Sequence, residues 1–314
     1  APSSSSPATS STGASGGVGK RVGISPTPPP REKNTRADTV HLSLTGGGAR
    51  GYAHIGCLRA IERLGLRVTE VSGSSIGAMV AALYAAGYSS REIERVSRTL
   101  TRRHLLRYNW PEARALANLF RPRNHRKPSG IWSLEPYYRT LSRLLRRARF
   151  KDLKLRCFIQ ATDLTNLRPI VFSRDLDPYM EVAFAVKASS AFPGVMAPVE
   201  WGGLTLADGG TFVNLSAIRI RARRVIVSCL SPLGEDARVP VTSLPKVVQA
   251  WMRYRERAAL PPELFAPNVT LMALAPSLTQ LKPFKLARPE VGRRIIAEAY
   301  RTALAALSKR TRRA

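Results

Sequence analysis

Two hydrophobic periods alternate along the first half of the chain and predict strands followed by helices. Apolar residues at every second position over 40–44 predict a short strand, and a second strand is expected over 68–72. A glycine-containing turn follows each strand, and apolar residues at helical spacing then occupy 53–64 and 76–86. Strands and helices that alternate in this way predict an α/β fold with a mostly parallel sheet and helices on both faces.

The second half continues this pattern less regularly. Residues 101–150 are expected to be helical and very basic, with an interruption at Leu134–Pro136. A last amphipathic helix, with apolar residues every four positions from Val291 to Leu307, is expected to pack on the core. The remaining predictions are strands over 155–161, 170–173, 204–206 and 224–230, and a helix over 178–189.

Composition divides the chain into a tail and one domain. Residues 1–38 are rich in Ser, Thr, Gly and Pro and cannot bury enough surface to offset the entropy of ordering, so we predict a disordered tail without an intact signal peptide. The domain is expected over 39–310, with its part 240–310 mostly helical. The longest apolar run, Ile76–Tyr88, is thirteen residues long. A spanning helix needs roughly 20, so no transmembrane segment is expected.

The net charge is extreme. The chain has 50 Lys and Arg against 21 Asp and Glu, a formal charge of +29. Such a surface attracts lipid or nucleic-acid phosphates, although a compositional bias without any binding role explains it as well. No nucleic-acid-binding signature accompanies the charge, so we expect peripheral contact with an anionic membrane and no nucleic acid. The three scattered cysteines fit buried apolar positions in a reducing, cytoplasmic compartment; the oligomeric state stays open.

A G-x-S-x-G motif lies between the second predicted strand and its helix. Gly73–Gly77 has the sequence G-S-S-I-G, which fits a nucleophile elbow with Ser75 at its tip. A serine at a sharp strand-to-helix turn needs small neighbours, here Gly73 and Gly77, because a Cβ would clash there. The following helix begins at the serine, and its dipole favours developing negative charge. Ser75 is therefore the predicted nucleophile; the alternative is a glycine-lined turn with a surface serine.

The glycine-rich loop Gly46–Gly51 has two interpretations. With Glu70 about twenty residues further on, it matches the dinucleotide fingerprint and predicts a dinucleotide-binding oxidoreductase. In a hydrolase, the same loop would supply amides to an oxyanion, each worth roughly 3–4 kcal/mol. Those amides belong to Gly46, Gly47 and Gly48. Arg50 favours an anion in either case, but only the hydrolase interpretation accounts for Ser75.

A nucleophilic serine needs a base, and the histidines are badly placed for this role. The four histidines are His41, His54, His104 and His125. None follows a late acid, as the usual hydrolase order Ser, acid, His requires, so a carboxylate is favoured. Asp208, at a strand end, is the first candidate because a partly desolvated carboxylate can take the serine proton. Asp163 and Glu181 are its rivals, and His54 is expected to make a structural hydrogen bond.

Together these motifs resemble the patatin-like phospholipases, and most closely the small bacterial members. The resemblance covers roughly residues 39–305 and rests on Gly46–Gly51, His54–Gly56, Gly73–Ala78, Ala188–Gly194 and Asp208–Gly210. It implies a three-layer α/β/α sandwich and a Ser–Asp dyad without histidine. Ser75 would attack an ester carbonyl, Asp208 would take its proton, and water would release the fatty acid from an acyl-enzyme.

The resemblance also implies roles for neighbouring residues. The amides of Gly46–Gly48 would form the oxyanion hole with Arg50 supporting that loop, and Gly209 and Gly210 would shape the proton-acceptor loop. It implies no metal and no organic cofactor. One departure stands after the aspartate, where the family usually continues toward Asn-Asn-x-Pro. This chain has Val213, Asn214, Leu215 and Ser216 there.

We therefore expect a serine lipid acyl hydrolase of the phospholipase A or lysophospholipase type, with a lipid or phospholipid acyl ester as substrate. The alternatives are the oxidoreductase and a basic membrane-binding protein with a decayed active site. The arginine-rich stretch 139–149 is hypothesised to shape lipid entry. Reversing the charge of Arg143, Arg146 and Arg147 would then weaken binding to anionic vesicles in a salt-dependent way.

Overall fold

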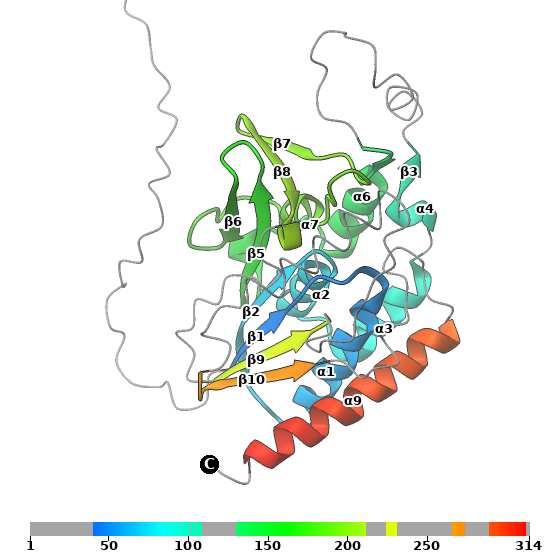
Figure 1. Ribbon diagram of the computed structural model, residues 1–314, viewed down its shortest axis with the longest axis vertical. Coiled ribbons are helices and arrows are strands. Elements are labelled where there is room, and N and C mark those ends of the chain that lie inside the picture. Colours follow the sequence, from blue (N-terminus) through cyan, green and yellow to red (C-terminus); the bar gives the residue numbers. More distant parts are fainter. Residues whose placement is uncertain are drawn as a thin grey trace, which may run out of the picture. The chain divides into compact units, whose positions relative to one another are not determined.

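A parallel group of strands forms the centre of the sheet (Figure 1). The computed structural model describes residues 40–100, 102–108, 130–211, 224–230, 266–273 and 289–311, all within the unit Arg36–Ala314. The sheet order is β10-β9-β1-β2-β5-β8-β7, and β6 also pairs with β5. The strands are β1 Val40–Leu44, β2 Val68–Ser74, β5 Arg156–Asp163, β6 Arg168–Ser173, β7 Val199–Trp201, β8 Leu204–Asp208, β9 Arg224–Cys229 and β10 Val269–Ala273.

The strand directions confirm the predicted fold class. Pairing is parallel from β10 to β5 and antiparallel where β6, β7 and β8 join. The α-helices are α1 Tyr52–Arg63, α2 Ile76–Ala85, α3 Ser90–Thr99, α4 Arg102–Leu105, α6 Glu135–Leu144, α7 Val182–Ser189 and α9 Pro289–Thr311. A mostly parallel central sheet with helices packed against it is an α/β fold and is consistent with a three-layer α/β/α sandwich.

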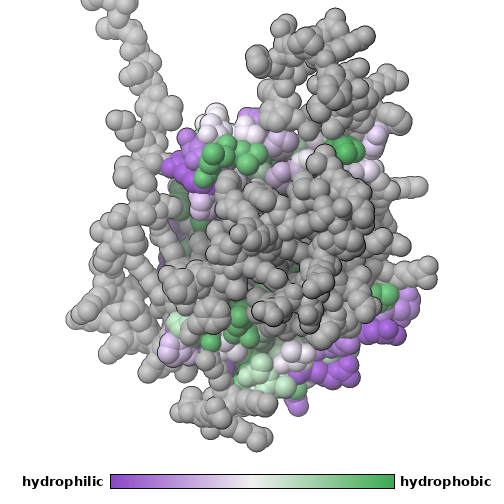
Figure 2. All heavy atoms as spheres, viewed as in Figure 1, coloured by the Kyte–Doolittle hydropathy of each residue, from purple (hydrophilic) through white to green (hydrophobic). Residues whose placement is uncertain are grey.

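The last helix packs along the first, as the apolar stripe predicts. Figure 1 shows α9 lying beside α1, and a Cβ added to Gly56 of α1 would lie 2.8 Å from the Ala299 Cβ and 2.7 Å from the Tyr300 nitrogen. The stripe Ile295, Ala299, Ala303 and Leu307 is buried. The other side of α9 is hydrophilic near its N-terminus, where Figure 2 shows purple side chains. Gly56 thus allows the backbones of α1 and α9 to approach closely.

Several boundaries differ from the sequence prediction. The interruption expected at Leu134–Pro136 is the start of α6. Proline lacks a backbone N–H, but the N–H groups of the first turn have no partner within the helix, so proline is tolerated there. The segment expected to be wholly helical also contains a two-stranded sheet of β3, Arg107–Tyr108, and β4, Trp132–Ser133. Helix α7 begins at Val182 instead of Pro178.

The strands β7 and β10 were not predicted, and β10 lies in the segment expected to be mostly helical. Both are short, and each becomes a strand by pairing with a neighbour, β8 or β9. The partner of β10 lies far earlier in the chain and leaves little signal in local periodicity, while the three residues of β7, joined to β8 by Gly202 and Gly203, are too few to show an alternation. The predicted tail and residues 213–216 lie outside the described residues.

The described part of the chain contains no helix long and apolar enough to cross a membrane. Its three cysteines, Cys57, Cys157 and Cys229, are buried and form no disulfide with one another. Burial raises the pKa of Cys57 to about 11, and only part of this rise is offset by a hydrogen bond from Ser228. The prediction that the cysteines serve as small buried apolar groups is confirmed.

Candidate active site

Ser75 occupies a tight turn between β2 and α2. Its backbone lies at φ 54°, ψ −121°, a region that costs a residue other than glycine about 1–3 kcal/mol. A Cβ at Gly73 would lie 2.6 Å from the Ala78 nitrogen, and one at Gly77 would lie 2.6 Å from the Thr45 oxygen. Neither position has room for a side chain. The predicted strand-turn-helix elbow is therefore present, with Ser75 partly exposed at its tip.

A buried serine fixes this turn from the neighbouring helix. Ser189, the last residue of α7, is fully buried and its Oγ accepts a hydrogen bond from the Ser75 amide at 2.8 Å. The same hydroxyl donates to the Gln160 carbonyl of β5 at 2.5 Å. Sequence reasoning noticed Ser189 only as part of the block Ala188–Gly194. Its link to Ser75 spans 114 positions and has no local signal.

Strands β2 and β8 meet end to end along one edge of β5. Strand β6 pairs with residues Phe158–Asp163 of β5 and occupies the other edge. On the shared edge Ser74 of β2 faces Gln160, and Asp208 of β8 faces Ala161, the next residue of β5. Because β2 runs parallel and β8 antiparallel to β5, their C-terminal ends abut. Successive residues on a strand are roughly 3.3 Å apart, so little space separates the two ends.

Contacts across this junction bring the predicted nucleophile and base together. A Cβ at Gly209 would lie 2.8 Å from the Ser74 Oγ, so the end of β2 and the segment after β8 are in contact there. The Gln160 side-chain amide also donates to the Gly209 carbonyl at 2.9 Å. Ser75 follows Ser74, and Asp208 precedes Gly209. The two residues therefore flank one contact, although 133 positions of sequence separate them.

Asp208 is held in place from several sides. Its side chain is buried, with the residue only 4% exposed, and its Oδ1 accepts the Gly210 amide at 2.8 Å. Its own amide donates to the Ala191 carbonyl at 2.9 Å, and its carbonyl accepts the Thr162 hydroxyl at 2.9 Å. The glycine after the aspartate thus supplies a hydrogen bond to the carboxylate. Such an arrangement fixes the rotamer of a candidate base.

A buried phenol lies within the electrostatic field of Asp208. Burial raises the pKa of Tyr137 far above its ordinary value, a hydrogen bond with Ser190 lowers it in part, and the charge of Asp208 raises it further. The Ser190 and Tyr137 hydroxyls are 3.5 Å apart. Tyr137 therefore stays protonated at neutral pH and adds no charge to the site. No sequence motif pointed to it.

The glycine loop packs directly against the elbow. Gly48–Gly51 forms a short 3₁₀-helix before α1, with Gly48 at φ 57°, a conformation that favours glycine. A Cβ at Gly51 would overlap the side chain of Ile76, the residue after Ser75, and one at Gly47 would lie 2.8 Å from Leu230. The structure thus places the loop beside the candidate nucleophile.

Arg50 anchors this loop to the end of β9. It is buried, with 6% of its surface exposed, and its Nη1 donates to the Leu230 carbonyl at 3.3 Å. Its amide also donates to the Gly47 carbonyl at 3.3 Å. These contacts are those of a residue that holds the loop in shape.

The rival carboxylates have other partners. Asp163 accepts hydrogen bonds from Thr165, Asn166 and Arg168 in the turn after β5. Burial raises the pKa of Asp163, but these hydrogen bonds outweigh burial and the pKa lies below its ordinary value. Glu181 accepts the Tyr138 hydroxyl at 2.7 Å before α7. These contacts give both residues structural roles and leave Asp208 as the carboxylate at the elbow.

Two buried histidines also serve the structure. His54 lies between the Thr45 carbonyl, at 2.8 Å, and the Ser228 hydroxyl, at 2.9 Å, and burial lowers its pKa to about 4. The prediction of a structural hydrogen bond is confirmed. The second buried histidine, His41, lies 3.3 Å from Glu70, the acid that the dinucleotide interpretation requires. Glu70 also lies 3.3 Å from Arg156.

The position of Glu70 in the sheet also disagrees with a dinucleotide site. Its register partner on β1 is His41, near the start of that strand, whereas the glycine loop follows the strand's end at Leu44. A ribose bound at the loop would need the acid at the same edge of the sheet. In the described ranges, no three His, Cys, Asp or Glu residues are grouped to hold a metal ion.

The fold and these motifs define one class of protein. Residues 42–218 match the family model described as patatin-like phospholipase, which is more than half of the chain. The chain therefore belongs to the patatin-like phospholipase family.

Individual relatives agree with this assignment. An NTE family protein of Mycobacterium bovis is 30% identical over 230 residues, which are 73% of this chain and 58% of that protein. Lysophospholipase NTE1 of Saccharomyces cerevisiae is 29% identical over 190 residues, 59% of this chain but 10% of that protein. The chain thus spans little more than half the length of the first relative. Among solved structures, VipD from Legionella pneumophila shares the fold, with a TM-score of 0.52 at 15% identity over 87% of this chain and 67% of that chain.

Proposed function

We propose that this protein is a serine lipid acyl hydrolase of the phospholipase A or lysophospholipase type, with Ser75 as nucleophile and Asp208 as base. The observation that carries the proposal is the end-to-end meeting of β2 and β8 on β5, which brings the two residues to one junction. Family membership and the relatives named lysophospholipase support the substrate class.

The proposed reaction has two steps. In the first, the Ser75 Oγ bonds to the ester carbonyl carbon while Asp208 takes the hydroxyl proton. The carbon–oxygen bond to the alcohol then breaks, and the leaving oxygen receives that proton. In the second, water gives a proton to Asp208, attacks the acyl-enzyme and releases the fatty acid, and Ser75 recovers its proton.

Negative charge on the carbonyl oxygen has two sources of stabilisation in this proposal. The amides of Gly46, Gly47 and Gly48 lie in the loop packed against the elbow, and Arg50 holds that loop against Leu230. The N-terminus of α2, which begins at Ile76, adds its dipole. The Gly210 amide holds the buried Asp208 carboxylate in one orientation, which supports its role as base.

The first test is hydrolysis of a p-nitrophenyl acyl ester series, followed by lysophospholipid. Wild type should turn over esters, and Ser75→Ala and Asp208→Asn should fall to background. Matched controls are Ser97→Ala on α3 and Asp175→Asn, an aspartate 52% exposed; both should keep near wild-type rates. An inactive wild type, or site variants as active as the controls, would reject the dyad and favour a basic membrane-binding protein with a decayed site.

A covalent probe separates the nucleophile from the choice of substrate. An alkyl fluorophosphonate phosphonylates an activated serine and releases fluoride, so intact-mass spectrometry should show one adduct on wild type. Peptide mapping should place the adduct on Ser75, and Ser75→Ala should give none. An adduct on another serine would contradict the assignment even if ester hydrolysis is observed.

Membrane contact through the arginine-rich segment is a separate part of the proposal. Arg143, at the end of α6, and Arg146 and Arg147, in the turn after it, are exposed. Replacing the three by glutamate should weaken co-sedimentation with vesicles of phosphatidylglycerol, and the loss should shrink as salt is raised. Unchanged sedimentation at low salt would contradict this contact.

A further inference from the structure

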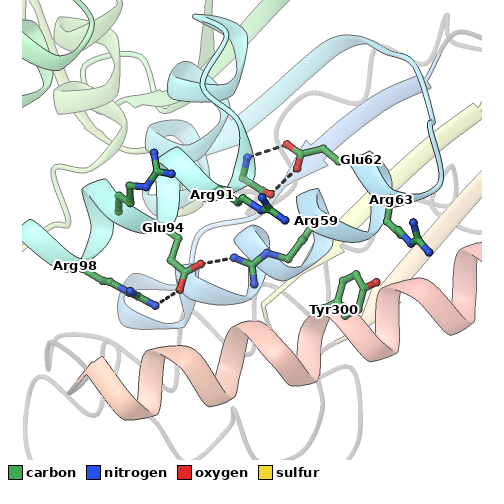
Figure 3. Close-up of a pocket in the computed structure, with 9 residues that line it drawn as sticks. Arg59, Glu62, Arg63, Arg91, Glu94, Arg98 and Tyr300 are labelled. Carbon is green, nitrogen blue, oxygen red and sulfur yellow. Dashed lines mark hydrogen bonds and ion pairs between the residues drawn. The ribbon is translucent and has the colours of Figure 1, made fainter.

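A pocket lies away from Ser75, between the helices α1, α3 and α9 (Figure 3). Its volume is about 720 Å³, within the range of small-molecule sites. Five of its nine lining residues are arginines and two are glutamates. The lining residues are Arg59, Glu62, Arg63, Ser90, Arg91, Glu94, Arg95, Arg98 and Tyr300. The pocket therefore carries a formal charge of +3.

The arginines come from one end of α1 and one face of α3. Residues 91, 95 and 98 recur at helical spacing along α3, so their side chains share a face. Arg59 and Arg63 lie in the last turns of α1, four residues apart. Figure 3 shows Arg59, Arg91 and Glu94 between α1 and α3, with Arg63 to one side of them and Tyr300 of α9 below. Two facing helices thus present like charges to one cavity.

The two glutamates of the pocket are already engaged. Both carboxylate oxygens of Glu62 accept hydrogen bonds from Ser90, from its amide at 2.8 Å and its hydroxyl at 2.5 Å. Glu94 pairs with Arg59 through one oxygen and with Arg98 through the other (Figure 3). Each of the four carboxylate oxygens thus has a partner within the described residues, and none of these partners is Arg63 or Arg91.

Three of the five arginines, Arg63, Arg91 and Arg95, are exposed and make no hydrogen bond or ion pair with any residue of the described ranges. The charge of Arg95 acts on Glu92. Arg63 and Arg91 therefore remain as the donors without an acidic partner among the described residues of the pocket. A guanidinium offers a planar fork of donors that matches phosphate oxygens. Two such forks in the lining of one pocket provide donors for a phosphate-bearing anion.

We propose that this pocket binds a phosphate-bearing anion at a site separate from Ser75. A phosphate would accept hydrogen bonds from Arg63 and Arg91, while the Arg59–Glu94 ion pair links α1 to α3. Glu62 lies eleven residues beyond Gly51, roughly 16 Å along the axis of α1. The glycine loop beside Ser75 and this site therefore lie at opposite ends of that helix.

The test measures binding without catalysis, in the Ser75→Ala background. Isothermal titration with inorganic pyrophosphate and co-sedimentation with phosphatidylcholine vesicles, with and without phosphatidic acid, probe free and lipid-borne phosphate. The pocket variant is Arg63→Gln with Arg91→Gln. The control is Arg67→Gln with Arg107→Gln, two exposed arginines outside the pocket that remove the same charge. Thermal melting checks that both variants fold.

The pocket variant should bind at least one of the two probes roughly tenfold more weakly than wild type, while the control stays within about twofold. A loss on vesicles alone identifies a lipid head group, and a loss on pyrophosphate identifies a soluble phosphate compound. Equal binding by pocket variant and control on both probes, or no binding by wild type, would overturn the proposal. None of these outcomes depends on whether Ser75 hydrolyses an ester.

Discussion

Replacing Ser189 by alanine tests how far the reactivity of Ser75 depends on one buried hydroxyl. The Ser189 Oγ accepts from the Ser75 amide at 2.8 Å and donates to the Gln160 carbonyl at 2.5 Å. Alanine removes both hydrogen bonds and adds no atom. A donor or acceptor that loses its partner in this way costs about 1–3 kcal/mol, so the folded state should lose about that much stability.

The same change should affect the geometry of the elbow. The backbone of Ser75 at φ 54° is strained by about 1–3 kcal/mol, which matches the hydrogen bond that alanine removes. The turn can then relax, and a misplacement of about 1 Å can cost about 100-fold in rate. We expect kcat to fall between about tenfold and 100-fold while KM stays near wild type, because Ser189 acts through Ser75 and does not contact substrate.

The assay pairs ester kinetics with fluorophosphonate labelling and urea unfolding. Ser189→Thr keeps a hydroxyl and should recover part of kcat. Ser142→Ala, another buried serine, on α6, is the matched control and should leave kcat unchanged. A Ser189→Ala protein that is folded and keeps kcat within about twofold of wild type would refute the reasoning.

Three further variants test the packing and the buried polar groups. Gly56→Ala should destabilise the fold by about 1–3 kcal/mol, since a methyl group there meets the backbone of α9; urea unfolding beside Thr302→Ala, an exposed position of α9, checks this. His54 has a pKa of about 4 in the folded state, so between about pH 6.5 and pH 4 only the unfolded chain binds the proton. The free energy of unfolding of wild type should therefore fall by roughly 3 kcal/mol over this pH range, and that of a His54→Gln variant should fall by less, as measured by urea unfolding. Asp163→Asn should lower the urea midpoint but leave kcat near wild type, in contrast to Asp208→Asn; a kcat at background would mean that Asp163 acts in catalysis.

Local pattern was sufficient for the first βαβα segment of the chain. The predicted strand 40–44, the helix after it, the strand that ends near Ser74 and the apolar helix behind it all appear within a few residues. The elbow is predictable because its requirements are local. Two glycines must stand where a Cβ would meet backbone, and Ser75 must stand between them.

The choice among carboxylates was not a local matter. Asp163 and Asp208 both end a strand, so strand position alone does not separate them; the sequence placed Asp208 first, and the resemblance to the family gave it the role of base. Only the folded chain shows that Asp163 is surrounded by donors of its own turn, while Asp208 abuts the end of β2. That junction depends on β8 joining β5 in the antiparallel direction, and strand direction leaves no mark in periodicity.

The sequence by itself determined the class of fold, the elbow at Ser75 and the family, because each rests on periodic patterns or short motifs whose residues are close together within each motif. The tertiary structure decided which carboxylate meets the elbow, which hydroxyl holds it and which arginines share the pocket between α1 and α3. Each of these depends on contacts between segments that are distant in sequence, such as Ser75 with Ser189, or Arg59 with Glu94. Such contacts form only when the burial of the whole core fixes the register and direction of every strand and helix.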